Sequence, residues 1–201
     1  MQPIRVTNSG NASLFHGVPD WVYEEEVLTS DYALWWSPDS SKVAFLTLDE
    51  TSVPEFSFPI YNPTEDNDAV VPYTHDVVMR YPKPGYPNPL VSVHIFDVSG
   101  YLSADSSPSV ADSTLTLVWD ERHPANDSII QEIAWVGDTT LLVKEVNRNA
   151  DNGSVIFFDL GPSNQFKEHG RVVRRLGKHG EQDDDGWIDP VSDNFVGVPV
   201  C

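Results

Sequence analysis

The sequence predicts an all-β fold, and three observations support this prediction. Short β-rich stretches recur along the 201 residues and are bounded by glycine, proline, aspartate or serine. The 16 prolines and 12 glycines are spread along the chain, which favours many short strands over long helices. A hairpin pattern at residues 34–48 recurs at residues 133–146, and a recurring hairpin is typical of β-propeller blades. A β-sandwich with two similar hairpins is the alternative that this pattern leaves open.

Seven stretches have the composition of strands. Residues 42–48 are rich in β-forming side chains, and residues 90–96 alternate as a half-buried strand does. The other five are residues 114–119, 129–136, 140–146, 154–160 and 171–176. Gly137-Asp138, between two of these stretches, predicts a tight hairpin turn. At four strands per blade, this strand content fills about three to four blades of a propeller.

The connecting segments differ in character. Residues 59–76 are polar and acidic, and predict a loop. Residues 80–89 carry four prolines, so we expect an extended, stiff segment that does not join a central sheet strand. The stretch from Pro84 to Pro87 formally matches a PxxP ligand, but we favour a rigid arm or loop at the rim of a propeller. Residues 101–113 predict a soft loop, and residues 182–186 predict an acidic turn.

One short helix is predicted directly after residues 17–19. Asp20 is a good N-cap, and Glu24, Glu25 and Glu26 lie where the helix macrodipole favours acidic side chains. Because successive residues of an α-helix turn by about 100°, two neighbouring glutamates can converge on one pocket while the third points elsewhere. Crowded carboxylates repel each other unless a cation lies between them, so such a pair favours an ammonium ligand. The alternative is a solvated acidic helix face on an acidic protein.

The charge and the cysteine content limit the possible partners and compartments. The net charge is −19 at pH 7, and such a surface repels nucleic acid and anionic membranes. The only cysteine is Cys201, so no disulfide can form within the chain. No apolar stretch has the length of a membrane span, and the start of the sequence lacks the apolar centre of a signal peptide. Asn11, Asn126 and Asn152 begin glycosylation sequons.

Motifs for hydrolysis and for metal binding are not found in the sequence. No Gly-x-Ser-x-Gly elbow occurs in the 201 residues. The six histidines have no zinc-motif spacing and no nucleophile partner that the sequence identifies. No phosphate-binding glycine-rich loop is present. We therefore expect no catalytic residue, no metal and no cofactor in this chain.

Several stretches resemble the dipeptidyl-peptidase IV-like family of prolyl oligopeptidase-type serine peptidases, and specifically its N-terminal β-propeller region. The most specific likeness is the run DWVYEEEV at residues 20–27, followed by ALWWSP at residues 33–38. The likeness continues through residues 53–58, through RYPKPG at residues 80–85 and through Asn88-Pro89, and more weakly from residues 133–135 to 186–187. The resemblance therefore covers nearly the whole chain.

The resemblance implies a fold and a function. In this family an eight-bladed propeller lies on an α/β-hydrolase domain, and the enzymes release N-terminal X-Pro or X-Ala dipeptides. Two glutamates on a short propeller helix bind the free α-ammonium of the substrate, and by motif position these are Glu25 and Glu26. Tyr23, Glu24 and Trp21 would support this helix. A free α-amine is largely protonated at neutral pH, and paired carboxylates accept its charged hydrogen bonds strongly. Their role would be to position the substrate, not to transfer a proton.

The resemblance also implies a domain organisation, partners and a compartment. Residues 1–201 would form part of the propeller, with the hydrolase domain absent from this sequence, so we expect the chain to be inactive alone. The expected partners are the N-terminus of a peptide, the hydrolase domain of the parent chain, and a second copy bound through residues 60–89. The parent would belong to the secretory pathway, as a membrane-anchored, secreted or vacuolar protein. A non-catalytic propeller for binding or scaffolding is the alternative function, and an unrelated β-rich adhesion domain is a third.

Overall fold

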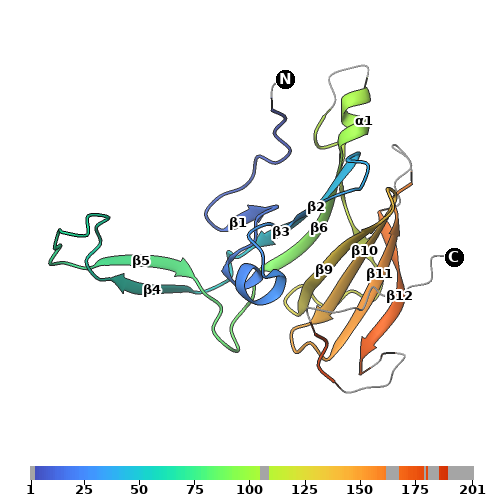
Figure 1. Cartoon of the computed structure of the whole chain (residues 1–201). Helices are drawn as coiled ribbons and strands as arrows, with labels where there is room; N and C mark the ends of the chain where they lie inside the picture. Colours follow the sequence, from blue (N-terminus) through green and yellow to red (C-terminus); the bar gives the residue numbers. More distant parts are fainter. Residues whose placement is uncertain (1–2, 105–108, 162–167, 179, 181–185, 190–201) are drawn as a thin grey trace.

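The protein is described by a computed structural model that covers residues 3–104, 109–161, 168–178, 180 and 186–189. These residues are nearly all in strands, turns and extended segments, with two short helices among them (Figure 1). The strands form two five-stranded sheets and a separate two-stranded ribbon. No helix of the described residues is long and apolar enough to cross a membrane.

The first sheet is antiparallel and is built around the long strand β3 (Lys42–Asp49). Strands β1 (Leu14–His16) and β2 (Leu34–Trp36) pair with the two ends of one edge of β3. Strand β6 (Leu90–Asp97) pairs with the other edge over the full length of β3. Strand β7 (Thr114–Thr116) pairs with β6 and completes the sheet.

The second sheet has the order β8-β12-β11-β10-β9. Strands β9 (Ser128–Val136), β10 (Thr140–Asn147), β11 (Asn152–Asp159) and β12 (His169–Gly177) follow each other antiparallel. The short strand β8 (Val118–Trp119) joins the far edge parallel to β12. All strands that the sequence predicted therefore form, with bounds that differ by one to two residues.

One predicted strand, residues 114–119, is divided between the two sheets. Its first part is β7 of the first sheet and its last part is β8 of the second. Leu117 lies between them, fully buried, and its backbone N–H donates to the carbonyl of Val93 at 2.9 Å. The chain crosses here from one sheet to the other, because the Leu117 side chain packs into the core between them.

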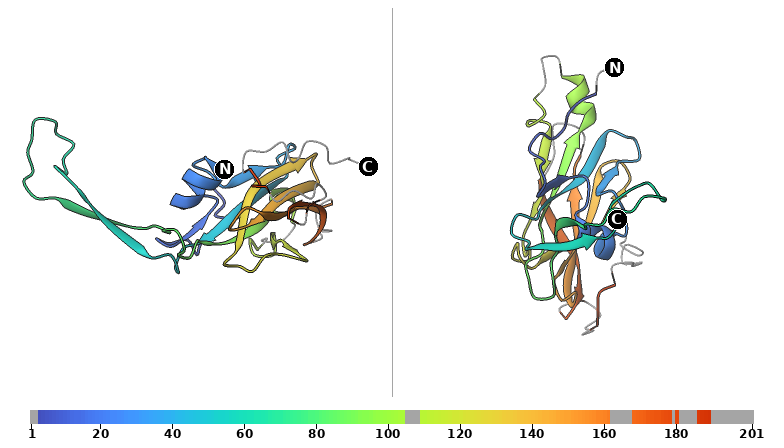
Figure 2. Two further views of the ribbon diagram at one scale, coloured as in Figure 1. Left: turned by 90° about the horizontal axis from the view of Figure 1, so that it is seen from below. Right: turned by 90° about the vertical axis from the view of Figure 1, so that its left-hand side faces the viewer.

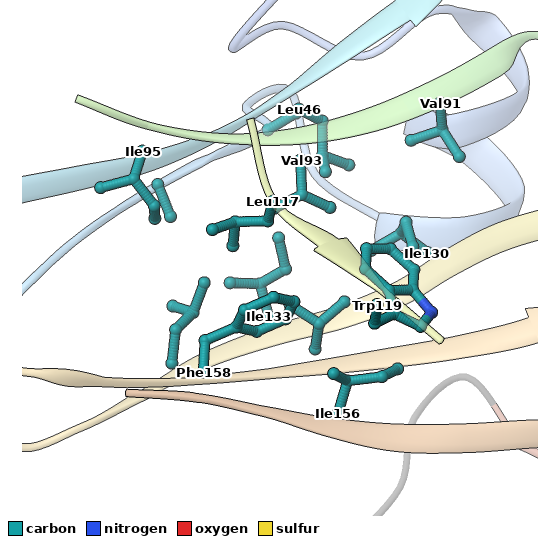
Figure 3. Close-up of a cluster of buried hydrophobic side chains, with 14 of the residues drawn as sticks. Leu46, Val91, Val93, Ile95, Leu117, Trp119, Ile130, Ile133, Ile156 and Phe158 are labelled. Atoms are coloured by element: carbon teal, nitrogen blue, oxygen red, sulfur yellow. The ribbon is translucent and has the colours of Figure 1, made fainter. Parts of the chain in front are cut away.

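The two sheets pack face to face over one hydrophobic core. In Figure 3 the aliphatic side chains of the first sheet point toward those of the second, with Trp119 beside Phe158. The first sheet contributes Leu46, Val91, Val93 and Ile95, and the second contributes Ile130, Ile133, Ile156 and Phe158. Alternate residues of β3 point to the other face of the sheet, where Val43 and Phe45 form a smaller cluster with Phe96. Such alternation between the two faces is typical of a β-strand.

The two recurring hairpins contact each other. The indole N–H of Trp135 donates to the carbonyl of Trp35 at 2.9 Å, and the backbone N–H of Asp39 donates to Asp138 Oδ1 at 3.1 Å. Gly137 has φ +63°, as the predicted tight turn requires. Trp35 and Trp135 pack against the core. Trp36 ends β2 but is 54% exposed, so in the first hairpin the preceding tryptophan covers the core.

The two-stranded ribbon projects from the first sheet as an arm (Figures 1 and 2). It consists of β4 (Glu55–Ile60) and β5 (His75–Arg80), paired antiparallel. The predicted loop at residues 59–76 is therefore the outer part of this arm. Residues 81–89 follow it without strand structure, as their prolines predicted.

The described residues form two blade-like sheets, whereas the strand count of the sequence predicted three to four blades. Each sheet uses five strands, and β4 and β5 leave the sheets for the arm.

A second helix, α1 (Val98–Ser103), occupies the start of the predicted soft loop at residues 101–113. Asp97 explains it, because its carboxylate accepts a hydrogen bond from the backbone N–H of Gly100 at 3.0 Å and so caps the first turn. Residues 105–108, residues 182–185 of the predicted acidic turn and Cys201 lie outside the described residues.

Candidate functional site

The acidic segment forms the helix that the sequence predicted, but with a wider turn. The helix η1 (Tyr23–Leu28) is of the π type and continues a first α-helical turn at Trp21 and Val22. The carboxylate of Asp20 accepts hydrogen bonds from the backbone N–H groups of Val22 (3.3 Å) and Tyr23 (3.2 Å). The predicted capping role of Asp20 is thus confirmed by its contacts. π-Helical turns are rare and occur often at functional sites.

Tyr23 fixes the helix to the second sheet. Its side chain is 1% exposed, and its hydroxyl oxygen accepts a hydrogen bond from the backbone N–H of Ile130 at 3.2 Å. Ile130 lies beside a bulge in β9, where the register with β10 shifts at Gln131. Burial raises the pKa of the Tyr23 phenol above its usual range, so the phenol stays neutral. Trp21 is only half-buried, so Tyr23 is the main anchor of the helix.

The three glutamates extend into solvent from this anchored turn. Glu24, Glu25 and Glu26 are all exposed, and none of their carboxylates forms a hydrogen bond or an ion pair with a residue that the structure describes. In Figure 1 the helix (blue) lies between the base of the arm and the beginning of β9. The arrangement therefore presents three anionic acceptors on one short, anchored segment.

A buried network beside Tyr23 holds the beginning of β9. The carboxylate of Glu145 is 1% exposed and accepts hydrogen bonds from Trp119 Nε1 (2.8 Å), Ser128 Oγ (2.6 Å) and the backbone N–H of His123 (3.2 Å). The Arg122 guanidinium lies 4.6 Å from the centre of the Trp119 ring, and its Nε is 3.8 Å from Glu145. The sequence did not indicate this network, since its members are far apart in the chain and form no motif.

Aromatic contacts connect the other flank of the helix to the arm. The rings of Trp21 and Tyr81 lie 4.4 Å apart between centroids, and those of Tyr81 and Phe56 lie 5.9 Å apart. The ammonium of Lys83 lies 4.6 Å from the centre of the Phe56 ring. Trp21 therefore packs against the base of the arm, while Tyr23 packs into the core.

The predicted glycosylation sites occupy different surroundings. Asn11 and Asn126 are exposed, whereas Asn152 is half-buried at the beginning of β11. Within the described residues, no group of three His, Cys, Asp or Glu side chains is arranged to hold a metal ion.

The sequence of the chain is similar to a known protein family and to several known proteins. The model of the dipeptidyl peptidase IV (DPP IV) N-terminal region matches residues 1–197. The "Probable dipeptidyl-aminopeptidase B" of Talaromyces stipitatus is 35% identical over 202 residues, which cover 98% of this chain and 20% of that protein. The "Probable dipeptidyl peptidase 4" of Emericella nidulans is 34% identical over 195 residues, which cover 96% of this chain and 22% of that protein.

A solved structure has a similar fold. The crystal structure of Porphyromonas gingivalis dipeptidyl peptidase 4 superposes with a TM-score of 0.65 at 26% sequence identity, over 87% of this chain and 21% of that one. The chain thus spans about a fifth of the length of the proteins that it matches.

Proposed function

The chain belongs to the family of dipeptidyl peptidase IV N-terminal regions, and from this we propose that it is the substrate-gating part of a DPP IV-like serine exopeptidase. Its fold is a partial β-propeller, all-β as the sequence predicted, with the two sheets as blades. The proposed parent releases N-terminal X-Pro or X-Ala dipeptides. Because residues 1–201 span only about a fifth of their relatives, the parent would supply the remaining blades and the hydrolase domain. This chain would bind and position the substrate rather than cleave it.

We propose that the carboxylates of Glu25 and Glu26 bind the α-ammonium of the substrate. The observation that carries this assignment is the anchored turn: Tyr23 is buried and hydrogen-bonded to the second sheet, while the glutamates after it are exposed. A protonated amine is bound best by acceptors that are already in place, since less conformational entropy is lost on binding. Fixing the amine determines how many residues reach the nucleophile, so the pair would set the length of the released product.

The neighbouring residues would support this pair. Tyr23 would hold the turn against β9, and Trp21 would hold it against Tyr81 at the base of the arm. Glu24 would add negative potential beside the pair without being a ligand itself.

The amine assignment can be tested by NMR on the 201-residue chain. We expect a peptide that begins with Ala-Pro to shift the resonances of helix η1, and its N-acetylated form to leave them unchanged. Glu25→Gln and Glu26→Gln should each reduce the shifts. Glu65→Gln, an exposed residue in the arm, is the matched control and should bind as the unchanged protein does. Equal shifts by both peptides would contradict the assignment.

The domain assignment can be tested separately, by sequencing the transcript beyond the codon of Cys201. An in-frame Gly-x-Ser-x-Gly elbow followed by Asp and His supports the peptidase. A stop codon there would favour the alternative, a non-catalytic propeller that binds peptides or acts as a scaffold.

We further propose that two copies of the chain associate through residues 60–89. The support is the row of exposed apolar side chains on the arm, among them Tyr61, Val70 and Tyr73. Light scattering during gel filtration should show a dimer that Tyr61→Asp together with Tyr73→Asp converts to a monomer. Tyr32→Asp, which is exposed outside the arm, should leave the dimer intact. A dimer that survives the double substitution would contradict this interface.

We place the parent in the secretory pathway, and the support is the three sequons, two of them at exposed asparagines. Expression in a eukaryotic host behind a signal peptide should give endoglycosidase-sensitive glycans at Asn11 and Asn126. Replacing both asparagines by glutamine should abolish most of the mobility change, and an unchanged mobility would contradict the placement.

A further inference from the structure

A cavity of about 360 Å³ lies where the first sheet, the helix and the arm meet. Apolar and aromatic side chains form much of its wall: Phe15 from β1, Trp21 from the first turn of the helix, and Val78 and Met79 from β5. Glu50, Glu55 and Arg80 form its polar side. Since a water molecule takes about 30 Å³ in the liquid, this space holds a ligand of roughly ten non-hydrogen atoms.

Glu50 is the unusual member of this wall. It is 6% exposed, yet its carboxylate forms no hydrogen bond and no ion pair with any residue that the structure describes. Its backbone is held in place, because its N–H donates to the Ser13 carbonyl (2.9 Å) and its carbonyl accepts from the Val53 N–H (2.8 Å). The carboxyl group is therefore kept at the cavity by the turn after β3. Its carboxylate oxygens are not sealed off from the cavity, so they can accept hydrogen bonds from a ligand that enters it.

Arg80 does not pair with Glu50. Its guanidinium donates to Ser13 Oγ (3.0 Å) and to the Val53 carbonyl (2.6 Å), and Nη2 is 3.5 Å from Glu55 Oε1. Desolvation by burial, and next to it the charge of the nearby Asp20, raise the pKa of Glu50 to about 7, and the opposing effect of the Arg80 charge is smaller. The carboxylates around the cavity thus outnumber its one cation, and they would attract positive charge.

We propose that this cavity binds a primary ammonium group on a short apolar stem, with the ammonium on Glu50 and the stem against Phe15, Trp21 and Met79. A charged hydrogen bond to Glu50 would satisfy its unpaired carboxylate. The Trp21 ring offers a favourable face to a cation or to an apolar stem. The apolar walls suit an organic cation better than a metal ion, which needs several oxygen ligands at once.

This site is distinct from the proposed substrate site, because it uses neither Glu25 nor Glu26. The two sites share one segment, since Trp21 lines the cavity and Asp20 caps the helix that carries the glutamates. The proposal does not depend on peptidase function, and its test separates the two.

The test is calorimetric titration of the 201-residue chain with benzylammonium at pH 8. We expect saturable binding that Glu50→Gln weakens about tenfold or more, the usual loss for a charged hydrogen bond. Glu65→Gln, the matched exposed control, should leave it unchanged. In a chain that carries both Glu25→Gln and Glu26→Gln, the binding that depends on Glu50 should persist, which separates this site from the substrate site.

The pH dependence gives a second readout. The charged groups in the cavity wall are Glu50, Glu55 and Arg80, and the charge of Asp20 outside the wall also acts on Glu50. With the pKa of Glu50 near 7, most of its carboxylate is protonated at pH 6, so benzylammonium should bind about tenfold more weakly at pH 6 than at pH 8. The Glu50→Gln variant should lose this pH dependence.

A further variant tests whether a loss of benzylammonium binding could come from misfolding. Met79→Trp fills the cavity without changing Glu50, and it should abolish binding while circular dichroism shows an intact fold. Titration with Nα-acetyl-lysine amide provides a second primary ammonium, on the flexible stem of a lysine side chain instead of the ring of benzylammonium. If neither ligand binds the folded chain, or if Glu50→Gln binds benzylammonium as tightly as the unchanged chain, the cavity holds only water and the proposal is overturned.

Discussion

Glu145 and Glu50 are both buried carboxylates, but their surroundings are opposite. Glu145 lies between Trp119 and Ser128 at the beginning of β9 and accepts three hydrogen bonds. Glu50 lies in the wall of a cavity and accepts none from the described residues. A glutamate thus completes a hydrogen-bonded network at the beginning of β9, whereas at the cavity a glutamate can still accept hydrogen bonds from a ligand. The difference teaches that partners, rather than burial, distinguish a structural carboxylate from a functional one.

Removal of the satisfied carboxylate should have the largest effect on stability. Glu145→Ala leaves the donors of Trp119, Ser128 and His123 without an acceptor and opens a void beside them. We expect a loss of about 3–5 kcal/mol in the free energy of unfolding. Urea denaturation measures it, and a loss below about 1 kcal/mol would contradict the structural role of Glu145.

Removal of the Glu50 carboxylate, which has no hydrogen-bond partner, should increase the free energy of unfolding at high pH. The pKa of Glu50 is about 7 in the folded protein and near 4.5 in the unfolded chain, so between these values the folded state binds more protons. Stability therefore falls as the pH rises from 4.5 to 7, by about 1–2 kcal/mol from this group once screening by solvent in the cavity is allowed for.

Glu50→Gln removes that decrease and should be more stable than the unchanged protein at pH 8. Urea denaturation at pH 5 and pH 8 shows the difference. Glu132 also has a pKa raised to about 7 by burial and contributes a similar decrease in both proteins, so it cancels in the comparison. If the two proteins lose the same stability between these pH values, Glu50 is not the unpaired group that we describe.

The anchor of the helix should show an intermediate effect. Tyr23→Phe keeps the ring in the core but leaves the backbone N–H of Ile130 without its acceptor. We expect a loss of about 1–3 kcal/mol. In addition, amide hydrogen exchange in residues 23–28 should become faster, because the turn loses its link to β9. Unchanged exchange there would mean that packing alone holds the helix.

The exposed glutamates should have the smallest effect on stability. Glu25→Gln and Glu26→Gln should each change the free energy of unfolding by less than about 0.5 kcal/mol, as is usual for exposed side chains without partners. A large change in urea denaturation would show a structural role that the geometry of the helix does not indicate.

The same contrast explains what the sequence could predict. β-rich composition and turn residues, with alternation at residues 90–96, identified the long strands, and the cap at Asp20 identified the helix, because these signals are local. The strands of the arm were missed, since both of their faces are exposed and their composition lacks the pattern of a half-buried strand. The split at Leu117 was also missed, because it depends on which sheet each neighbour belongs to.

The partners of the key side chains were beyond sequence analysis for a similar reason. Tyr23 and Ile130 are 107 residues apart, and Trp119 and Glu145 are 26 residues apart. Glu50 follows a strand without any motif, so its burial and its lack of partners depend on how the base of the arm packs beside β1 and the helix. The family resemblance indicated Glu25 and Glu26, but nothing in the sequence indicated the cavity.

The central claim is that Glu25 and Glu26 bind the amine of the substrate, and kcat/KM of the parent enzyme tests it most directly. With an X-Pro substrate that has a free N-terminus, we expect Glu25→Gln and Glu26→Gln each to lower kcat/KM by about a hundredfold. The Glu65→Gln enzyme should match the unchanged one. If both helix variants keep kcat/KM within about twofold of the unchanged enzyme, the helix is not the amine site and the account is wrong.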